Sequence, residues 1–338
     1  MQMVYSFQLW KHPNIHYREA LLRLSRCELI SMLGALSIPA EISVESMGAS
    51  VFLTFEAREL TLDELRLLAM HSCVTLLCEK VGNLLKPLPV ESGDAFPEDL
   101  PEILKYKGKT NPTFTRMMLN TALSMTSFFP HPEQPVVLDP LCGKATTLFC
   151  AACMGASALG LDADRRSLRE AETYFSRYLK AAGIKHSLSS VNQTVGSQGV
   201  PGAIFRYALS RDEYKKGNTR FLALYAGDAA LAGPLLRKNR ADILVTDLPY
   251  GVQHAPTGPG GTESFHSFPD RLLSSWSEAL NPGAALAVSF NSLTLKRKVL
   301  MDLLSAHGFL VLDDPIRSGL SHTVEQAVVR DLIFAVRP

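Results

Sequence analysis

The hydrophobic and polar positions predict a different order of strands and helices in the first 90 residues from that after residue 135. In the first part, short β-branched or aromatic runs predict strands, and apolar residues spaced by three and four predict helices. The predicted order is strand 3–10, helix 18–36, strands 40–46 and 50–57, helix 61–72 and strand 73–81. This order is typical of a small α+β unit of ferredoxin-like type.

Residues 86–101 contain proline, glycine and acidic residues without apolar periodicity, so we interpret them as a linker. We therefore predict two domains, 1–95 and 96–338. A basic loop then leads into a helix within 105–125, with Asn111 as its N-cap and Pro112 at its first position.

After residue 135, predicted helices alternate with predicted strands, which cover 135–140, 156–164, 221–228, 241–250, 284–291, 308–314 and 327–336. Alternation of this kind predicts a mostly parallel, Rossmann-like α/β sheet covered by helices on both faces. We expect the last two strands to form an antiparallel hairpin at one edge. Residues 184–220 are polar and aperiodic, and we interpret them as an irregular surface excursion.

Composition limits the classes of protein to consider. The chain has 338 residues, 46% of them hydrophobic, which is enough for a large core and excludes a disordered protein. Its 34 Lys and Arg against 33 Asp and Glu give a formal charge of +1. A nucleic acid would therefore be held by a local basic patch. No stretch approaches the roughly 18 apolar residues of a membrane span, and the amino terminus has no signal-peptide pattern, so we expect a cytoplasmic protein with no membrane partner.

The six cysteines show no disulfide ladder, so we expect reduced thiols. Cys150 and Cys153 form a C-x-x-C spacing, which suits a redox pair, half of a zinc site, or two small core residues. They lie in an apolar helical run, and no second pair or histidine cluster accompanies them. We favour the core interpretation and predict no metal site.

Candidate chemistry gathers where the predicted strands end, because ligands of an open parallel sheet bind beyond its carboxyl ends. The first strand ends at Asp139 and Pro140, and Gly143 follows in a small-residue turn whose backbone N–H groups can approach a ligand. This is neither a phosphate loop nor a G-x-G-x-x-G motif, since Ala145 stands where the second glycine would be.

The next two strands also end in acids. Asp162 lies 19 positions after Gly143, where a carboxylate can accept hydrogen bonds from ribose hydroxyls, and the alternative is that Asp162 or Asp164 caps the following helix. We favour Asp164 as the cap. Asp228 is a candidate acceptor for an adenine amino group, with Ala229 beside it, and its alternative role is a turn residue after Gly227.

The fourth strand ends in the tetrapeptide Asp247-Leu248-Pro249-Tyr250. The Asp247 carboxylate and the Leu248 carbonyl can both point at one small target, and the exocyclic amine of a nucleobase fits that target. Two acceptors on its hydrogens would favour a nucleophilic, pyramidal amine, and the carboxylate would stabilise the developing positive charge. Tyr250 would stack on the base.

Four segments in this order, "DPLCGKATT", "LGLDAD", "YAGDA" and "DLPYG", resemble the class I S-adenosylmethionine-dependent methyltransferases of exocyclic amines, whose signature is Asn/Asp-Pro-Pro-Tyr/Phe. The chain more narrowly resembles tRNA guanine-N2 methyltransferases of the THUMP-associated group. The likeness covers about 105–338, including "KYKGKTNPTFTR" and "SHTVEQAVVRDLIFAV". Over 1–95 the ferredoxin-like order resembles the RNA-facing amino-terminal domains of these enzymes, which implies an RNA-facing module there. It implies a cytoplasmic RNA methyltransferase with S-adenosyl-L-methionine as cofactor and tRNA as the favoured partner.

The resemblance also assigns roles. The catalytic residues would be Asp247, Leu248, Pro249 and Tyr250. The cofactor would contact Asp247 and three loops that contain Asp139, Pro140, Leu141, Cys142, Gly143, Asp162, Ala163, Asp228 and Ala229. Among these, Asp139, Leu141 and Gly143 would line the methionine end, Asp162 the ribose, and Asp228 and Ala229 the adenine.

The remaining predictions concern the surroundings. Residues 251–268 are rich in glycine and proline and predict a mobile loop over the site, with a plain long connection as the alternative. His254 in this segment would contact substrate or have no role, rather than act as a base. Basic residues of 105–116 and Arg317 are candidate phosphate contacts. The alternatives to guanine-N2 transfer are an adenine or cytosine amino-methyltransferase on DNA or rRNA, and an inactive cofactor- or RNA-binding partner.

Overall fold

The amino-terminal part of the computed structural model is a five-stranded antiparallel sheet with two helices. The structure describes residues 2–10, 15–97, 99–106, 109–250, 257–258, 261–262, 264–265 and 267–338. The elements here are β1 (Gln2–Leu9), α1 (Ile15–Ala35), β2 (Ser43–Met47), β3 (Ser50–Arg58), α2 (Leu62–Leu68), β4 (Val74–Val81) and β5 (Leu84–Pro87). They follow the predicted order with one added strand, β5, and the sheet order is β2-β3-β1-β4-β5.

The larger part is a Rossmann-like sheet, as the alternation of strands and helices predicted. Its strands are β6 (Val136–Asp139), β7 (Ser157–Asp162), β8 (Lys185–Val195), β9 (Gln198–Ala208), β10 (Arg220–Ala226), β11 (Ala241–Asp247), β14 (Leu280–Asn291), β15 (Leu310–Leu312), β16 (His322–Glu325) and β17 (Val328–Val336). Five of them, in the order β10-β7-β6-β11-β14, are parallel. This is the 3-2-1-4-5 order of a doubly wound sheet.

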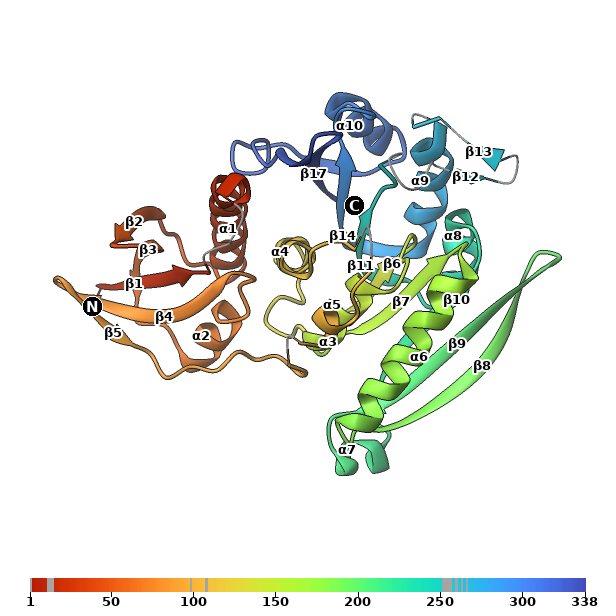
Figure 1. The fold of residues 1–338 in the computed structure, drawn as a ribbon, viewed down its shortest axis with the longest axis horizontal. Helices are drawn as coiled ribbons and strands as arrows, with labels where there is room; N and C mark the ends of the chain where they lie inside the picture. The colour runs from red at the N-terminus through yellow and green to blue at the C-terminus, as the bar shows by residue number, and fades with distance from the viewer. Residues whose placement is uncertain are drawn as a thin grey trace.

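Helices cover both faces of this sheet (Figure 1). One face packs against α4 (Pro112–Leu123), α5 (Thr146–Cys153) and α6 (Arg165–Ala181). The opposite face packs against α8 (Ala232–Leu236), α9 (Ser267–Ala279) and α10 (Arg297–Ala306). Short elements join them: α3 (Asp99–Ile103), α7 (Arg211–Lys216), the 3-10 helix η1 (Ala229–Leu231) and the two-residue strands β12 (Thr257–Gly258) and β13 (Gly261–Thr262). As predicted, α4 begins at Pro112, and the Asn111 side chain accepts a hydrogen bond from the Thr113 N–H at 2.9 Å.

The interpretation of 184–220 as irregular is wrong, because β8 and β9 form a long antiparallel hairpin there, followed by α7. The hairpin extends the sheet beyond β10 and projects at the lower right of Figure 1. Phe205 and Tyr207 of β9 are buried and contact Phe175 of α6. Strand β8 is mostly exposed and polar, so only one of the two strands carries an apolar signal, and the sequence pattern hides the pair.

The other edge also differs from the prediction. β15 and β17 pair antiparallel as expected, but β17 also pairs with β14 and therefore lies inside the sheet. β15 forms the edge, and β16 pairs with β17 beside it. Seven of the nine residues of β17 are buried, which fits a position between two strands rather than at an open edge.

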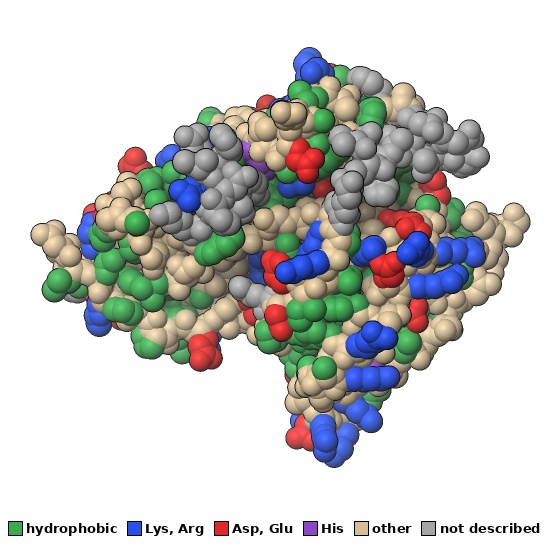
Figure 2. All heavy atoms as spheres, viewed as in Figure 1, with side chains coloured by type: hydrophobic (Ala, Val, Ile, Leu, Met, Phe, Trp, Pro, Cys, Tyr) green, Lys and Arg blue, Asp and Glu red, His purple; other side chains and the backbone are tan. Residues whose placement is uncertain are grey.

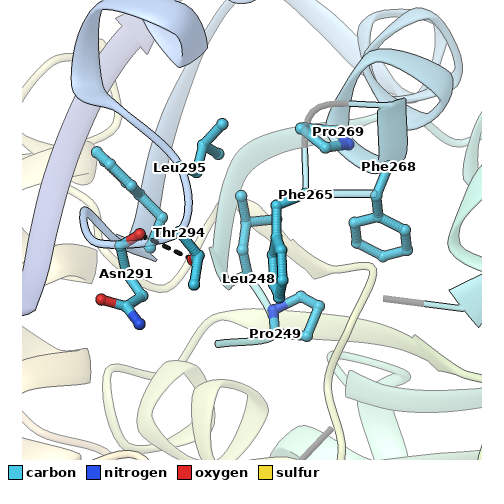
Figure 3. Close-up of a pocket in the computed structure, with 9 residues that line it drawn as sticks. Leu248, Pro249, Phe265, Phe268, Pro269, Asn291, Thr294 and Leu295 are labelled. Carbon is cyan, nitrogen blue, oxygen red and sulfur yellow. Dashed lines mark hydrogen bonds between the residues drawn. The ribbon is translucent and has the colours of Figure 1, made fainter. Parts of the chain in front are cut away.

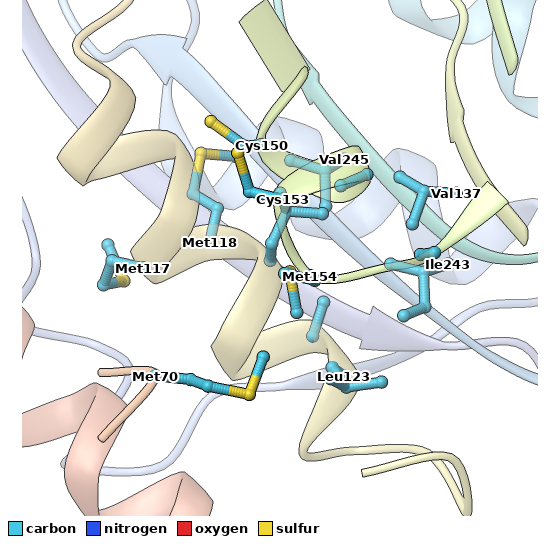
Figure 4. Packing of buried hydrophobic residues seen from close by; sticks show 14 of the residues in the cluster. Met70, Met117, Met118, Leu123, Val137, Cys150, Cys153, Met154, Ile243 and Val245 are labelled. Atoms are coloured by element: carbon cyan, nitrogen blue, oxygen red, sulfur yellow. The ribbon is translucent and has the colours of Figure 1, made fainter. Parts of the chain in front are cut away.

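The cysteines of the C-x-x-C spacing lie in the core. Cys150 and Cys153 are both buried in α5, and all six cysteines are free thiols. Figure 4 shows the two thiols among Met118, Val245 and neighbouring side chains. Burial raises the pKa of the Cys150 thiol to about 12, which makes it unreactive. Within the described ranges, no group of three or more possible ligands is placed to bind a metal ion.

The amino-terminal unit is attached to the sheet domain through α1 and α4. The Asn120 side chain of α4 donates hydrogen bonds to the buried Glu28 carboxylate at 2.6 Å and to the Met70 carbonyl at 2.8 Å. Glu28 also accepts hydrogen bonds from Ser72, and the His71 ring lies 3.4 Å away. This buried polar network sets one position of α1 on α4, because every group in it needs its partner.

None of the helices in the described part of the chain is both long and apolar enough to cross a membrane.

Candidate active site

One cleft of about 970 Å³ opens at the carboxyl ends of the parallel strands. All the predicted catalytic and cofactor-binding residues line it: Asp139, Pro140, Leu141, Cys142, Gly143, Asp162, Ala163, Asp228, Ala229, Asp247, Leu248, Pro249 and Tyr250. These residues come from four strands and span more than a hundred positions of the chain. The parallel order of the strands brings their ends to one side of the sheet.

Asp139 ends β6 and is almost fully buried. Its carboxylate accepts hydrogen bonds from the Thr246 hydroxyl at 2.8 Å and from the Leu141 N–H at 3.1 Å. Burial raises the pKa of this carboxyl from 3.8 to about 6, because the apolar surroundings disfavour its charged form, while hydrogen bonds from Thr147 and Thr246 lower it. A positive charge bound beside Asp139 would therefore favour its ionised form.

Two residues of the loop after β6, Gly143 and Ala145, have positive φ angles. Gly143 has a φ of +51°, and an added Cβ there would meet no atom within 4 Å. Ala145 has a φ of +69°, is fully buried, and precedes α5. An alanine pays a steric cost in this left-handed region, where glycine is the usual residue. The Ala145 N–H donates to the Cys142 carbonyl at 2.7 Å, so the turn is closed by its own backbone.

Asp162 and Asp164, at the end of β7, have different roles, and the predicted role of Asp164 as a helix cap is confirmed. Asp164 caps α6, since its carboxylate accepts hydrogen bonds from the Arg166 N–H at 2.9 Å and the Ser167 hydroxyl at 2.7 Å. Asp162 accepts from the Gly143 N–H and from the Asp164 N–H, both at 2.8 Å. These contacts join the loops after β6 and β7 and fix the Asp162 carboxylate at the wall of the cleft.

Asp228 caps η1 and also forms an ion pair. Its carboxylate accepts a hydrogen bond from the Ala230 N–H at 2.8 Å. The Arg271 guanidinium of α9 reaches both of its oxygens, at 2.7 and 3.2 Å. The turn role and the location in the cleft therefore coexist in this residue, and a ligand amine at Asp228 would compete with Arg271.

Asp247 ends β11 and lies in a network of side chains from four elements. Its Oδ2 accepts a hydrogen bond from the Thr110 hydroxyl at 2.9 Å. Its Oδ1 accepts from the Ser289 hydroxyl at 2.5 Å and from the Tyr250 hydroxyl. The Arg330 guanidinium lies 3.7 Å from Oδ2. The carboxylate is 23% exposed and faces the cleft, so it is both oriented by the protein and accessible.

Tyr250 and Arg330 form the wall beside this carboxylate. The Arg330 Nε donates to the Tyr250 hydroxyl at 2.6 Å. The guanidinium carbon of Arg330 lies 4.5 Å from the centre of the Phe114 ring and 5.4 Å from that of Tyr250. Burial and the Asp247 charge raise the pKa of the Tyr250 hydroxyl well above its ordinary value, so Tyr250 stays a hydrogen-bond donor. Stacking of this ring on a base remains a prediction.

Leu248 and Pro249 turn toward an apolar region behind the cleft. Leu248 is buried, and a small cavity of about 10 Å³ separates this pair from side chains that include Phe268 and Leu295 (Figure 3). The Leu248 N–H donates to the Ser289 carbonyl at 2.8 Å. A proline at position 248 could not make this hydrogen bond, so the Asp-Leu-Pro-Tyr form ties the tetrapeptide to β14.

Sequence reasoning missed the residues that hold Asp247. Thr110, Ser289 and Arg330 come from a loop, β14 and β17, and each is an ordinary polar residue in its own segment. It also missed Arg271, and Tyr106, whose hydroxyl lies 2.9 Å from that of Thr146 at the cleft wall. The one available signal was a charged Arg330-Asp331 pair inside an otherwise apolar strand, where a buried charge needs a partner.

Two of the candidate phosphate contacts have partners within the protein. Arg116 is buried and paired with Asp94 at 2.5 Å. Arg317 pairs with Asp314 and approaches the Ser31 hydroxyl at 3.4 Å. The prediction that these two side chains contact phosphate is therefore wrong, because α4 packs in the core and residue 317 packs against α1. Most of the predicted mobile loop, His254 included, lies outside the described residues.

Comparison with known proteins leaves the sequence without a matched family. No family model matches the chain, and no curated protein matches it. Among solved structures, TrmN from Thermus thermophilus aligns at 16% identity with a TM-score of 0.42, and the alignment covers 88% of this chain and 60% of TrmN. The chain thus spans less than two thirds of the length of TrmN.

Two further structures have similar scores. A Pyrococcus horikoshii protein described as a candidate RNA methyltransferase aligns at 12% identity and a TM-score of 0.40, covering 71% of this chain and 96% of its own. Magnesium protoporphyrin IX methyltransferase from Synechocystis, with SAM bound, aligns at 13% identity with a TM-score of 0.39. The alignment covers 69% of this chain and 87% of that enzyme. Each TM-score is below 0.5, so the function is argued below from the site itself.

Proposed function

We propose that this protein is an S-adenosyl-L-methionine-dependent methyltransferase that acts on the exocyclic amine of a nucleobase in RNA, with N2 of a tRNA guanine as the favoured acceptor. The observation that supports this most is the position of Asp247. Its carboxylate lies at the carboxyl end of the central strand β11, held by three hydroxyls, in the same cleft as Asp139, Asp162 and Asp228.

The chemistry of the cleft fits the proposed cofactor. Three carboxylates end neighbouring strands, and the cofactor has a charged amino group, a ribose diol and an adenine amine that carboxylates can bind. Backbone approach is possible at Gly143, where no side chain intervenes. When bound, the cofactor supplies an activated methyl group. Asp139, Asp162 and Asp228 would hold it, and the cleft volume of about 970 Å³ leaves room for a base as well.

Asp247 can bind an amine in one particular way. A carboxylate oxygen accepts up to two hydrogen bonds. Oδ1 already accepts two from Tyr250 and Ser289, whereas Oδ2 accepts one from Thr110. An amine hydrogen can therefore approach Oδ2 from the cleft, and the negative charge stabilises the positive charge that grows on the nitrogen during transfer. No base is needed before attack, so orientation supplies most of the rate.

The amino-terminal unit completes the proposal. The sheet order β2-β3-β1-β4-β5 supports the proposal of a ferredoxin-like domain. A hydrogen bond joins α1 to α4, and Thr115 and Met118 of α4 line the cleft. We propose that this unit faces RNA, so that a base flipped from its stack reaches Asp247. The buried free thiols suit a cytoplasmic protein.

Two measurements test the proposal in sequence. Calorimetric titration with S-adenosylmethionine should give saturable binding, and absence of heat at millimolar cofactor would reject the cofactor assignment. Transfer of a labelled methyl group to unmodified tRNA should follow, with N2-methylguanosine in the hydrolysed product. Recovery of methyladenosine or methylcytidine instead would keep the chemistry and change the acceptor, whereas binding without transfer to tRNA, rRNA or DNA would favour an inactive partner.

A further inference from the structure

The solvent-facing side of α6 is a basic surface that the proposed reaction does not use. The helix carries five basic residues and two acidic ones. At 100° per residue, the basic ones fall on one side, opposite the buried Leu168, Ala171, Phe175 and Leu179. We call this set the α6 basic face, and it comprises Arg165, Arg166, Arg169, Arg177 and Lys180, all of them exposed.

The arrangement costs helix stability. The amino-terminal end of a helix carries a partial positive charge, so cations there are unfavourable. Three of the five, Arg165, Arg166 and Arg169, lie within the first five residues of α6, and no acidic residue lies in its first turn. The Asp164 carboxylate at the N-cap offsets part of this positive charge, and the remaining cations face solvent.

Internal pairing does not explain the charges. Arg166 pairs with Glu170 at 3.3 Å, and Glu170 also pairs with Lys144. The structure, over the residues it describes, shows no ion pair for Arg165, Arg169, Arg177 or Lys180. The whole chain has a formal charge of only +1, so the five cations on one helix face do not simply reflect an excess of basic residues in the protein.

The face also leads to the active site. Arg166 and Ser167, in the first turn of α6, line the cleft. Figure 2 shows Lys and Arg side chains gathered along α6 from the cleft toward α7, where Lys215 and Lys216 lie on the exposed end. From residue 165 to 180 the helix rises by about 22 Å, which is long enough to follow several phosphates.

We propose that the α6 basic face binds the ribose-phosphate backbone of the RNA whose base enters the cleft. This rests on the proposed function and adds a second RNA contact to it, on the side of the cleft away from the amino-terminal unit. The contact would be to phosphates, independent of base sequence, and would set the direction in which the strand leaves the site. The β8–β9 hairpin, which packs beneath α6, would hold this helix out at the edge of the molecule.

Salt dependence of RNA binding tests the proposal. Each neutralised phosphate contributes about 0.7 to 0.9 to the slope of log affinity against log salt concentration. The variant Arg169→Gln/Arg177→Gln/Lys180→Gln should therefore lower this slope by about 2 to 3 and weaken binding of an unmodified tRNA transcript at least tenfold at low salt. None of the three side chains lines the cleft, so cofactor binding should not change.

The matched control is Arg237→Gln/Lys238→Gln/Lys298→Gln, which removes the same charge from exposed positions near α8 and on α10. It should keep the slope of the parent protein, and Arg169→Lys/Arg177→Lys should keep it too. Equal slopes and affinities for the parent and the Gln triple variant would overturn the inference and leave methyl transfer intact. If the parent protein bound no RNA at any salt concentration, the proposed function would fail with it, which is a distinguishable result.

Discussion

The two sides of the cleft hold their carboxylates by different means. On the cofactor side, Asp139, Asp162 and Asp228 each accept a hydrogen bond from a backbone N–H two residues further on, at Leu141, Asp164 and Ala230. Each also has one more distant partner in the chain, respectively Thr246, Gly143 and Arg271. On the acceptor side, Asp247 is held by hydroxyls of Thr110 and Ser289, which lie 137 and 42 positions away, and by that of Tyr250.

The difference matches what each side has to do. A bound cofactor is fixed by many contacts at once, so local turns that position one acceptor each are sufficient. A reacting amine is fixed by few contacts, and a small displacement is costly in rate, so its partner needs support from several rigid elements. We infer that the cofactor side tolerates single substitutions better than the acceptor side, and four predictions test this contrast.

The largest effect is expected for Asp247→Asn. The substitution keeps the size of the side chain but removes the charge that stabilises the amine in the transition state, so kcat should fall by roughly 100- to 1000-fold. Cofactor affinity should change little. Asp242→Asn makes the same change at the other end of β11, away from the cleft, and should retain activity. An unchanged kcat for Asp247→Asn would place the chemistry elsewhere.

Arg330→Gln should have the next largest effect. Arg330 donates to Tyr250 and lies 3.7 Å from Asp247, so its loss should let both side chains move. We expect kcat to fall about 10- to 100-fold, as for a lost charged hydrogen bond, with KM for RNA nearly constant and partial rescue by Arg330→Lys. A rise in KM alone would instead make Arg330 a direct RNA contact. Arg297→Gln, which breaks a different buried ion pair, controls for stability.

On the cofactor side, Asp228 and Arg271 should have smaller and opposite effects. Asp228→Asn should weaken binding of S-adenosylmethionine about tenfold, the cost of one charged hydrogen bond. Arg271→Gln removes the guanidinium that occupies Asp228 and should strengthen binding a few-fold. Calorimetry on both single variants and the double variant measures the coupling. Weaker binding by Arg271→Gln would show that the arginine contacts the cofactor itself.

The smallest effect concerns pH. Burial raises the pKa of Asp139 to about 6, so the folded protein keeps a proton between about pH 4 and 6 that the unfolded chain has released. The free energy of unfolding should therefore decrease as the pH rises through this window. Binding of the positively charged cofactor should weaken as the pH falls below about 6, because Asp139 is then neutral. Asp139→Asn should flatten both profiles, and persistence of either profile would assign it to another group.

Much of this architecture follows from local patterns. The alternation after residue 135 indicates a parallel sheet, and the acids Asp139, Asp162, Asp228 and Asp247 each end an apolar run, so their meeting at one edge follows from strand direction alone. The hairpin at 185–208 was not predictable in this way, since one of its strands is exposed and polar on both sides. The position of β17 inside the sheet depends on its pairing with both β14 and β15, which its own residue pattern does not indicate.

The sequence by itself determined that strands alternate with helices after residue 135 and that an acid stands near the end of each of four strands, because both patterns are local to one segment. Only the tertiary structure decided which distant side chains close around Asp247, that Arg271 reaches Asp228, and that the cations of α6 face solvent beside the cleft. Such contacts depend on how strands and helices are packed, and a packed contact between residues far apart in the chain leaves no periodic signal in either segment.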